Sequence, residues 1–167
     1  MIRKLKSEDI ETVCKIVNDN WETVYRGYVN PLLINSDGCK DRALRLEKDF
    51  RSKRLSEYVW DEDGHIAGML SFGETADSDR TGCFEIWRIY IAFQFQGKGI
   101  GSQMLSFAEW AAKEMGYGHI LIWAFKNNAR AISFYKMHGY AIEKEVYLGD
   151  AYKACGVRLV KEISTIQ

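Results

Sequence analysis

The sequence predicts an α/β (α+β) fold: a single domain over residues 1–167, with a mixed, mostly antiparallel sheet of about seven strands, a parallel central pair and about four flanking helices. Two observations carry this prediction. Strand segments in the first half are joined by a short Asp-Gly turn, which is typical of an antiparallel hairpin. The second half contains a strand–helix–strand unit over 84–125, which requires a parallel crossover. A chain of 167 residues is long enough for one domain with a substantial core and short for two.

Composition and charge exclude several classes of protein. Apolar residues make up 47% and charged residues 28% of the chain, an ordinary globular balance. Lys plus Arg and Asp plus Glu are both 23, and without a basic excess we expect no nucleic-acid or membrane-surface partner. The four cysteines form no C-x-x-C pair, so we expect no metal site. Because no long apolar stretch follows Met1, we expect a cytoplasmic protein.

The first half of the chain predicts three strands and two helices. Ser7 is a favourable N-cap, and apolar residues at helical spacing follow it to about residue 25. Strands are expected over 2–5, 58–60 and 65–72, a second helix over 41–54, and a polar loop over 74–82.

The central stretch is a strand of β-branched and aromatic residues over 84–93, followed by a glycine-rich turn and a helix over 100–115. Gly97, Gly99 and Gly101 stand at every second position of that turn. Glycines leave room for a ligand, and the first turn of a helix has unpaired N–H groups that suit a phosphate. The plainer interpretation is a tight turn that binds nothing.

The last third predicts another strand–helix–strand sequence. Glycines at 116 and 118 end the long helix, and an apolar strand follows over 119–125. A helix is expected over 129–138, then strands over 140–147 and 152–162.

Two better-known phosphate loops do not fit the glycine-rich turn. The dinucleotide fingerprint needs its third glycine one position later, and the P-loop spacing is absent. The pattern Gln96-x-x-Gly99-x-Gly101 instead resembles the acyl-CoA motif of the GCN5-related N-acetyltransferases, Arg/Gln-x-x-Gly-x-Gly/Ala. The later run Asn128-x-x-Ala131-x-x-Phe134-Tyr135-x-x-x-Gly139-Tyr140 is similar to the family's downstream motif, with Tyr in place of Phe at the last position.

The resemblance implies the acyl-CoA N-acyltransferase fold and an acetyl-CoA site between two splayed parallel strands, 84–93 and 119–125. The pantetheine arm would pair with backbone groups of Ile89, Tyr90 and Ile91, and an N–H at about Ile91 would polarise the thioester carbonyl. Asn128 would bind the pantetheine or its loop. The residues expected to hold the diphosphate are Gln96, Gly97, Lys98, Gly99, Ile100, Gly101 and Ser102.

The same resemblance suggests the catalytic pair. Tyr135 would be the general acid, because a phenol close to the sulfur can protonate the leaving thiolate. Its alternative role is a simple core hydrogen bond. Glu85 is the preferred base, acting directly or through water, and Glu74 is a weaker choice. His65 and His119 are the least favoured alternatives.

The expected acceptor is a primary amine of a small molecule or peptide, acetylated in a ternary complex. Trp21, Tyr25, Tyr28 and Glu74 are expected on the acceptor side, where aromatic faces and carboxylates suit a cation. The sequence does not choose among a polyamine, a drug-like amine, a peptide N-terminus and a lysine. A non-catalytic acyl-CoA sensor and an unrelated nucleotide-binding protein are the competing hypotheses, and a homodimer is implied by resemblance alone.

Overall fold

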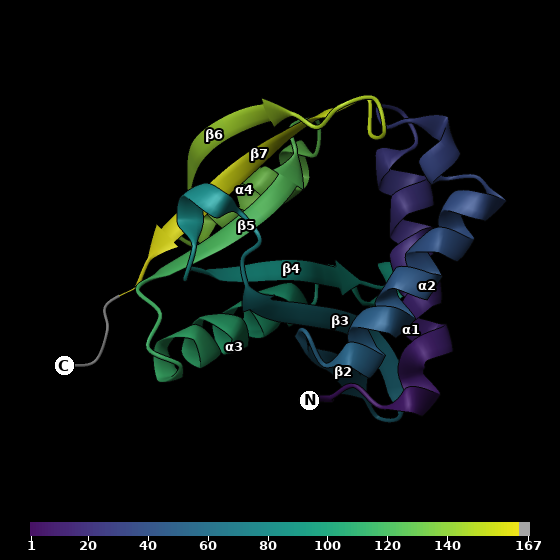
Figure 1. Ribbon diagram of the computed structural model, residues 1–167. Coiled ribbons are helices and arrows are strands. Elements are labelled where there is room, and N and C mark those ends of the chain that lie inside the picture. Colours follow the sequence, from purple (N-terminus) through teal and green to yellow (C-terminus); the bar gives the residue numbers. More distant parts are fainter. Residues whose placement is uncertain (164–167) are drawn as a thin grey trace.

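The computed structural model describes residues 1–163 and contains one seven-stranded sheet (Figure 1). Residues 164–167, the end of the predicted 1–167 domain, lie outside the described residues. The strands are β1 Ile2–Lys4, β2 Ser56–Glu62, β3 His65–Glu74, β4 Phe84–Ile91, β5 His119–Phe125, β6 Ala141–Tyr147 and β7 Cys155–Glu162. Their order is β1-β2-β3-β4-β5-β7-β6, and within 1–163 only β4 and β5 run parallel. The predicted fold class is confirmed.

Four helices cover the two faces of the sheet: α1 Ile10–Asn20, α2 Ser36–Ser52, α3 Ile100–Glu114 and α4 Ala129–Met137. Figure 1 shows α1 and α2 on one side of the β2–β4 strands and α3 on the other. The alternation of strand side chains explains this arrangement. Met69 of β3 packs in the core that contains Val17 and Leu46, whereas its neighbour Leu70 packs in the core of Met104 and Tyr135.

Several predicted boundaries differ from the structure. Helix α2 begins at Ser36, five residues before the expected start, because Asn35 accepts a hydrogen bond from the Gly38 N–H (2.9 Å) and caps a polar first turn that shows no apolar periodicity. Ser7 is not the N-cap expected for the first helix. It opens a 3-10 turn, and the Asp9 carboxylate accepts the hydrogen bond from the Lys6 N–H (2.9 Å).

The first helix also ends differently, since regular α-helix stops at Asn20 and a single π-helical turn, Trp21–Tyr25, follows. The central strand ends at Ile91, two residues before the predicted end, where a 3-10 turn begins at Phe93. The final strand begins at Cys155, three residues later than predicted.

The parallel pair opens after three residues. Strand β4 pairs with β5 only over Phe84–Ile86 against Ile120–Ile122, although both strands continue beyond this. On its other side, β4 carries a β-bulge at Trp87: Ser71 lies opposite Arg88 and Phe72 opposite Ile86, which leaves Trp87 unpaired. A bulge bends its strand and increases the local twist. The two strands therefore diverge, as the resemblance implies.

Candidate active site

A cavity of about 400 Å³ occupies the opening between β4 and β5. This volume falls within the range of small-molecule sites, roughly 300–1,000 Å³. Its walls come from the second half of β4, the turn before α3, β5, α4 and the end of α1. The predicted site residues that line it are Tyr25, Ile89, Tyr90, Ile91, Gln96, Gly97, Gly99, Ile100, Gly101, Ser102, Asn128 and Tyr135. The structure thus brings together residues that the sequence separates by more than a hundred positions.

The backbone of β4 presents unpaired groups to this opening. Ala92 donates its N–H to the Ala67 carbonyl (2.9 Å), which makes Gly68 and Ile91 a non-hydrogen-bonded pair in the antiparallel ladder. The N–H groups of Ile91 and Ile89 therefore point away from β3 and toward β5, whereas those of Tyr90 point toward β3. This edge can accept an extended ligand in the way that a sheet accepts another strand.

The Ile91 carbonyl is already occupied. It accepts hydrogen bonds from the side-chain amides of Asn20 (3.2 Å) and Gln96 (3.1 Å). Gln96 thus fastens the glycine-rich turn to the end of β4, and the Ile91 N–H is the peptide group left for a ligand.

The glycine-rich turn has the conformation that a diphosphate site needs. Gly97 (φ 75°) and Gly99 (φ 77°) are left-handed, a conformation in which other residues are strained. Gly99 is the N-cap of α3 and provides no side-chain hydrogen bond, so the N–H groups of Ile100, Gly101 and Ser102 have no partner within the helix. No heavy atom lies within 4 Å of a Cβ built at Gly97 or Gly99. The turn therefore offers open amides at a positive helix end, which fits the diphosphate of coenzyme A.

Lys98 does not line the cavity, and its ammonium lies 5.0 Å from the centre of the Phe95 ring. Asn128 does line it, and its side-chain oxygen caps α4 by accepting from the Ala131 N–H (3.2 Å). The amide nitrogen of Asn128 is therefore the part of that side chain available to a ligand.

Tyr135 lies on the inner face of α4 and is 7% exposed. Burial raises the pKa of its phenol above the usual value, with a smaller contribution from Tyr90. The phenol is therefore protonated at neutral pH, as a proton donor must be.

Glu85 is buried (6% exposed) on the opposite face of β4 from Ile86, and it is not part of the cavity lining. Burial raises its pKa from 4.5 to about 7, the nearby Asp77 carboxylate contributes in the same direction, and a hydrogen bond from the Thr75 hydroxyl (2.6 Å) partly opposes the shift. A carboxyl with a pKa near neutrality can exchange protons at physiological pH.

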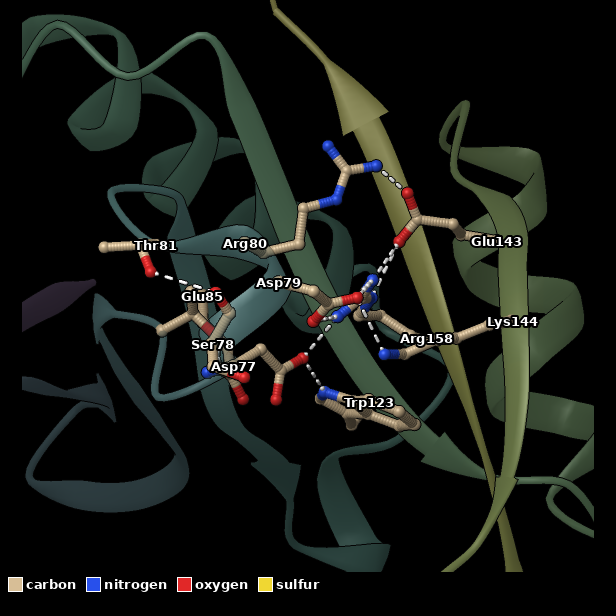
Figure 2. Close-up of polar contacts among 11 residues, drawn as sticks. Asp77, Ser78, Asp79, Arg80, Thr81, Glu85, Trp123, Glu143, Lys144 and Arg158 are labelled. Atoms are coloured by element: carbon tan, nitrogen blue, oxygen red, sulfur yellow. Dashed lines mark hydrogen bonds and ion pairs between the residues drawn. The ribbon is translucent and has the colours of Figure 1, made fainter.

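A charged network holds the loop beside Glu85 (Figure 2). Arg158 of β7 is 2% exposed and pairs with Asp77 (2.7 Å), Asp79 (2.8 Å) and Glu143 (2.7 Å). Trp123 of β5 also donates its indole N–H to Asp77 (2.9 Å). Since the Asp77 N–H donates in turn to Thr75 Oγ1 (3.1 Å), the network fixes the hydroxyl that binds Glu85.

The predicted acceptor residues separate into two groups. Trp21, Tyr25 and Tyr28 do gather, with ring centroids 4.9–5.9 Å from Phe125 at the end of β5. Of the three, only Tyr25 lines the cavity, and the Trp21 indole donates to the Tyr90 hydroxyl (3.0 Å). Glu74 lies outside the cavity at the end of β3, where it accepts from the Gly82 N–H (3.3 Å).

Sequence reasoning missed several lining residues. Trp87 enters the wall through the bulge, and Trp123 faces the cavity from β5. No local signal in the sequence marks either residue, although both come from strands that were predicted. The missed residues include Asn20, Trp87, Arg88, Trp123, Arg130 and Phe134.

Two features are absent from residues 1–163. No helix in this range is both long and apolar enough to cross a membrane. No three His, Cys, Asp or Glu side chains of the same range are grouped so that they could hold a metal ion.

The chain is similar to known acetyltransferases. It is 28% identical over 151 residues to the spermidine N(1)-acetyltransferase of Thermoplasma acidophilum, covering 85% of this chain and 88% of that one. The crystal structure of paia N-acetyltransferase from the same organism, in complex with coenzyme A, aligns with a TM-score of 0.75 at 20% identity, over 98% of both chains. The structure of yncA from Salmonella typhimurium with acetyl-CoA, a putative acetyltransferase by its description, aligns at 0.74 and 18% identity, over 100% of this chain and 95% of that one.

The family signal itself covers most of the cavity wall. The acetyltransferase (GNAT) family profile matches residues 14–140, which include the second part of α1, the opening of β4 and β5, the glycine-rich turn and Tyr135. This protein belongs to the GNAT family of acetyltransferases.

Proposed function

We propose that this protein transfers the acetyl group of acetyl-CoA to a primary amine within a ternary complex, with Tyr135 as general acid and Glu85 as base. The observation that carries the proposal is the cavity between β4 and β5. It joins a helix terminus with unpaired N–H groups, a free strand edge and a buried phenol in one continuous space. Similar structures are described with coenzyme A or acetyl-CoA bound, which supports the choice of co-substrate.

The co-substrate supplies an activated thioester, and the residues of this chain direct its reaction. The N–H groups of Ile100 to Ser102 would hold the diphosphate, and those of Ile89 and Ile91 would align the pantetheine along β4. The Ile91 N–H would stabilise the negative charge that develops on the carbonyl oxygen. The amine forms a new C–N bond as the C–S bond breaks, and Tyr135 gives its proton to the departing sulfur. The nitrogen then releases its second proton as the amide forms, and this proton restores the Tyr135 phenol.

The amine must lose a proton before it attacks, since an ammonium has no lone pair. Because Glu85 lies outside the cavity lining, we propose that it receives this proton through water rather than by direct contact. Trp87, Trp123 and Tyr25 would form the acceptor wall, and their ring faces suit a cationic amine. The similarity to a spermidine acetyltransferase makes polyamines the first acceptors to test.

A non-catalytic acyl-CoA sensor is the second candidate, and one observation favours it. The base that we propose is shielded from the cavity, as it would be in a protein that binds acetyl-CoA without using it.

The decisive experiment fixes acetyl-CoA and screens amines, including spermidine, lysine peptides and peptide N-termini, by release of free thiol. Binding is measured separately by the rise in melting temperature with coenzyme A, since a ligand bound to the native state alone stabilises it. Thiol release with any amine supports the enzyme. Stabilisation without release by the whole panel supports the sensor, and no stabilisation at millimolar coenzyme A refutes both.

A further inference from the structure

A histidine stands directly behind the glycine-rich turn. His138 at the end of α4 contacts Ser102 of α3, with 3.1 Å between Nε2 and the serine Oγ. Its Nδ1 lies 2.8 Å from the Phe134 carbonyl oxygen, and its ring packs against the Phe134 ring at 4.4 Å between centroids. Ser102 lines the cavity at the first turn of α3, among the residues proposed to hold the diphosphate. This histidine was not among the site residues expected from the sequence.

The two contacts determine how the imidazole and the hydroxyl share protons. A carbonyl oxygen can only accept, so Nδ1 carries a hydrogen in every state of His138. In the neutral ring, Nε2 is therefore an acceptor, and the Ser102 hydroxyl must donate its single hydrogen to it. In the protonated ring, Nε2 donates to Ser102 Oγ and the hydroxyl hydrogen becomes free.

A diphosphate oxygen is also only an acceptor. While His138 is neutral, Ser102 offers such an oxygen a lone pair in place of a hydrogen, which is unfavourable. Once His138 is protonated, Ser102 can donate to the diphosphate, and the imidazolium adds a positive charge behind it.

We propose that His138 is a positioning residue for the coenzyme A diphosphate: its protonation turns the Ser102 hydroxyl into a donor toward the cavity, so that binding of the coenzyme is accompanied by proton uptake. This inference rests on the proposed function, because it assumes that the diphosphate lies at the first turn of α3.

Other charged groups lie on the elements packed around His138. They are Lys98 before α3, Glu109, Lys113 and Glu114 on α3, Arg130 and Lys136 on α4, and Arg158, Lys161 and Glu162 on β7. Glu109 and Lys161 form an ion pair with each other (2.9 Å). Lysine and arginine ordinarily keep their charge between pH 5.5 and 8, and histidine is the residue type in this set whose ordinary pKa lies in that range.

The affinity for the coenzyme and the protonation of His138 are thermodynamically linked. If the pKa of His138 is higher in the complex than in the free protein, the dissociation constant must rise with pH across the same interval. Each unit by which binding raises that pKa corresponds to a tenfold difference in affinity. For one new charge-assisted hydrogen bond, we expect the affinity to fall about tenfold between pH 5.5 and 8.

The experiment titrates the protein with dephospho-coenzyme A by calorimetry from pH 5.5 to 8. This probe keeps the diphosphate but lacks the 3′-phosphate, a monoester whose own pKa near 6 would obscure the result. NMR titration of His138, assigned with the His138→Gln variant, gives its pKa in the free and bound protein. The expected result is that the pH dependence of binding equals the measured rise in that pKa.

Three variants test whether the pH dependence of binding arises from the Ser102 hydroxyl or from a long-range effect of the His138 charge. His138→Gln should bind with an affinity that varies less than about twofold over this pH range, and His65→Gln, which changes an exposed histidine of the β2–β3 hairpin, should behave as the wild type. Ser102→Ala should bind more weakly and should also lose most of the pH dependence, since a long-range charge effect would survive that change.

The outcomes test the role of His138 separately from the proposed acetyltransferase function. Binding by the wild type that is independent of pH, or a pH dependence that survives in Ser102→Ala, overturns the role of His138 and leaves the coenzyme site intact. Absence of binding at every pH overturns the proposed function itself.

Discussion

Replacing Glu85 by Gln should make the protein more stable at high pH. The folded-state pKa of this carboxyl is about 7, whereas its ordinary value is 4.5, because the buried site disfavours the ionised form. The native state therefore holds a proton that the unfolded chain releases between these values, and the free energy of unfolding falls as pH rises through that interval. The change amounts to roughly 3 kcal/mol at most, at 1.36 kcal/mol per pKa unit. Glutamine has the same shape and cannot ionise.

Urea unfolding at pH 4.5, 6, 7 and 8.5 measures this effect. Near pH 4.5 the wild type and Glu85→Gln should differ little, and by pH 8.5 the variant should be more stable by about 2–3 kcal/mol. Glu74→Gln is the matched control, because it makes the same substitution at an exposed position of the neighbouring strand β3. The same Glu85→Gln variant should lose the rise in kcat/KM near pH 7 that a base of this pKa would cause. Parallel stability curves for wild type and Glu85→Gln would refute the claim that burial keeps this carboxyl protonated.

Three further predictions concern the acid, the turn and the charged network. Tyr135→Phe should lower kcat about 10²- to 10⁴-fold while changing coenzyme A affinity less than about threefold; turnover equal to wild type would remove Tyr135 from the acid role. Gly99→Ala should lose about 1–2 kcal/mol of stability in urea unfolding, because the Gly99 φ is 77°, and it should weaken coenzyme A binding in a thermal shift assay. The control is Gly118→Ala, which should leave binding unchanged because Gly118 lies in open space and has no positive φ. Arg158→Met should cost about 1.5–3 kcal/mol at neutral pH, because Asp77, Asp79 and Glu143 lose their shared cation. Since the Arg158 hydrogen bond holds the pKa of Asp79 below its ordinary value, this cost should shrink as pH falls below about 4; a loss independent of pH would point to packing instead.

The elements that the sequence predicted correctly are those whose signals are local. Alternating or continuous apolar runs mark the strands, and a stripe at helical spacing marks α3. The turn before α3 is equally local, since Gly97 and Gly99 occupy left-handed positions that disfavour other residues. Where the local signal was polar, as in the first turn of α2, the predicted boundary was wrong by five residues.

The amino-acid sequence by itself determined the strands and helices, the glycine-rich turn before α3, and the presence of the two family motifs in one chain. Only the tertiary structure decided which side chains share a space. Examples are the bulge that places Trp87 in the cavity wall and the burial of Glu85. Two side-chain contacts are further examples: His138 with Ser102, 36 positions apart, and Arg158 with Asp77, 81 positions apart. Such contacts depend on strand order and register, and a shift of one residue would turn every side chain of a strand to the other face. Local propensities carry no information on that choice, which is made by the packing of the whole domain.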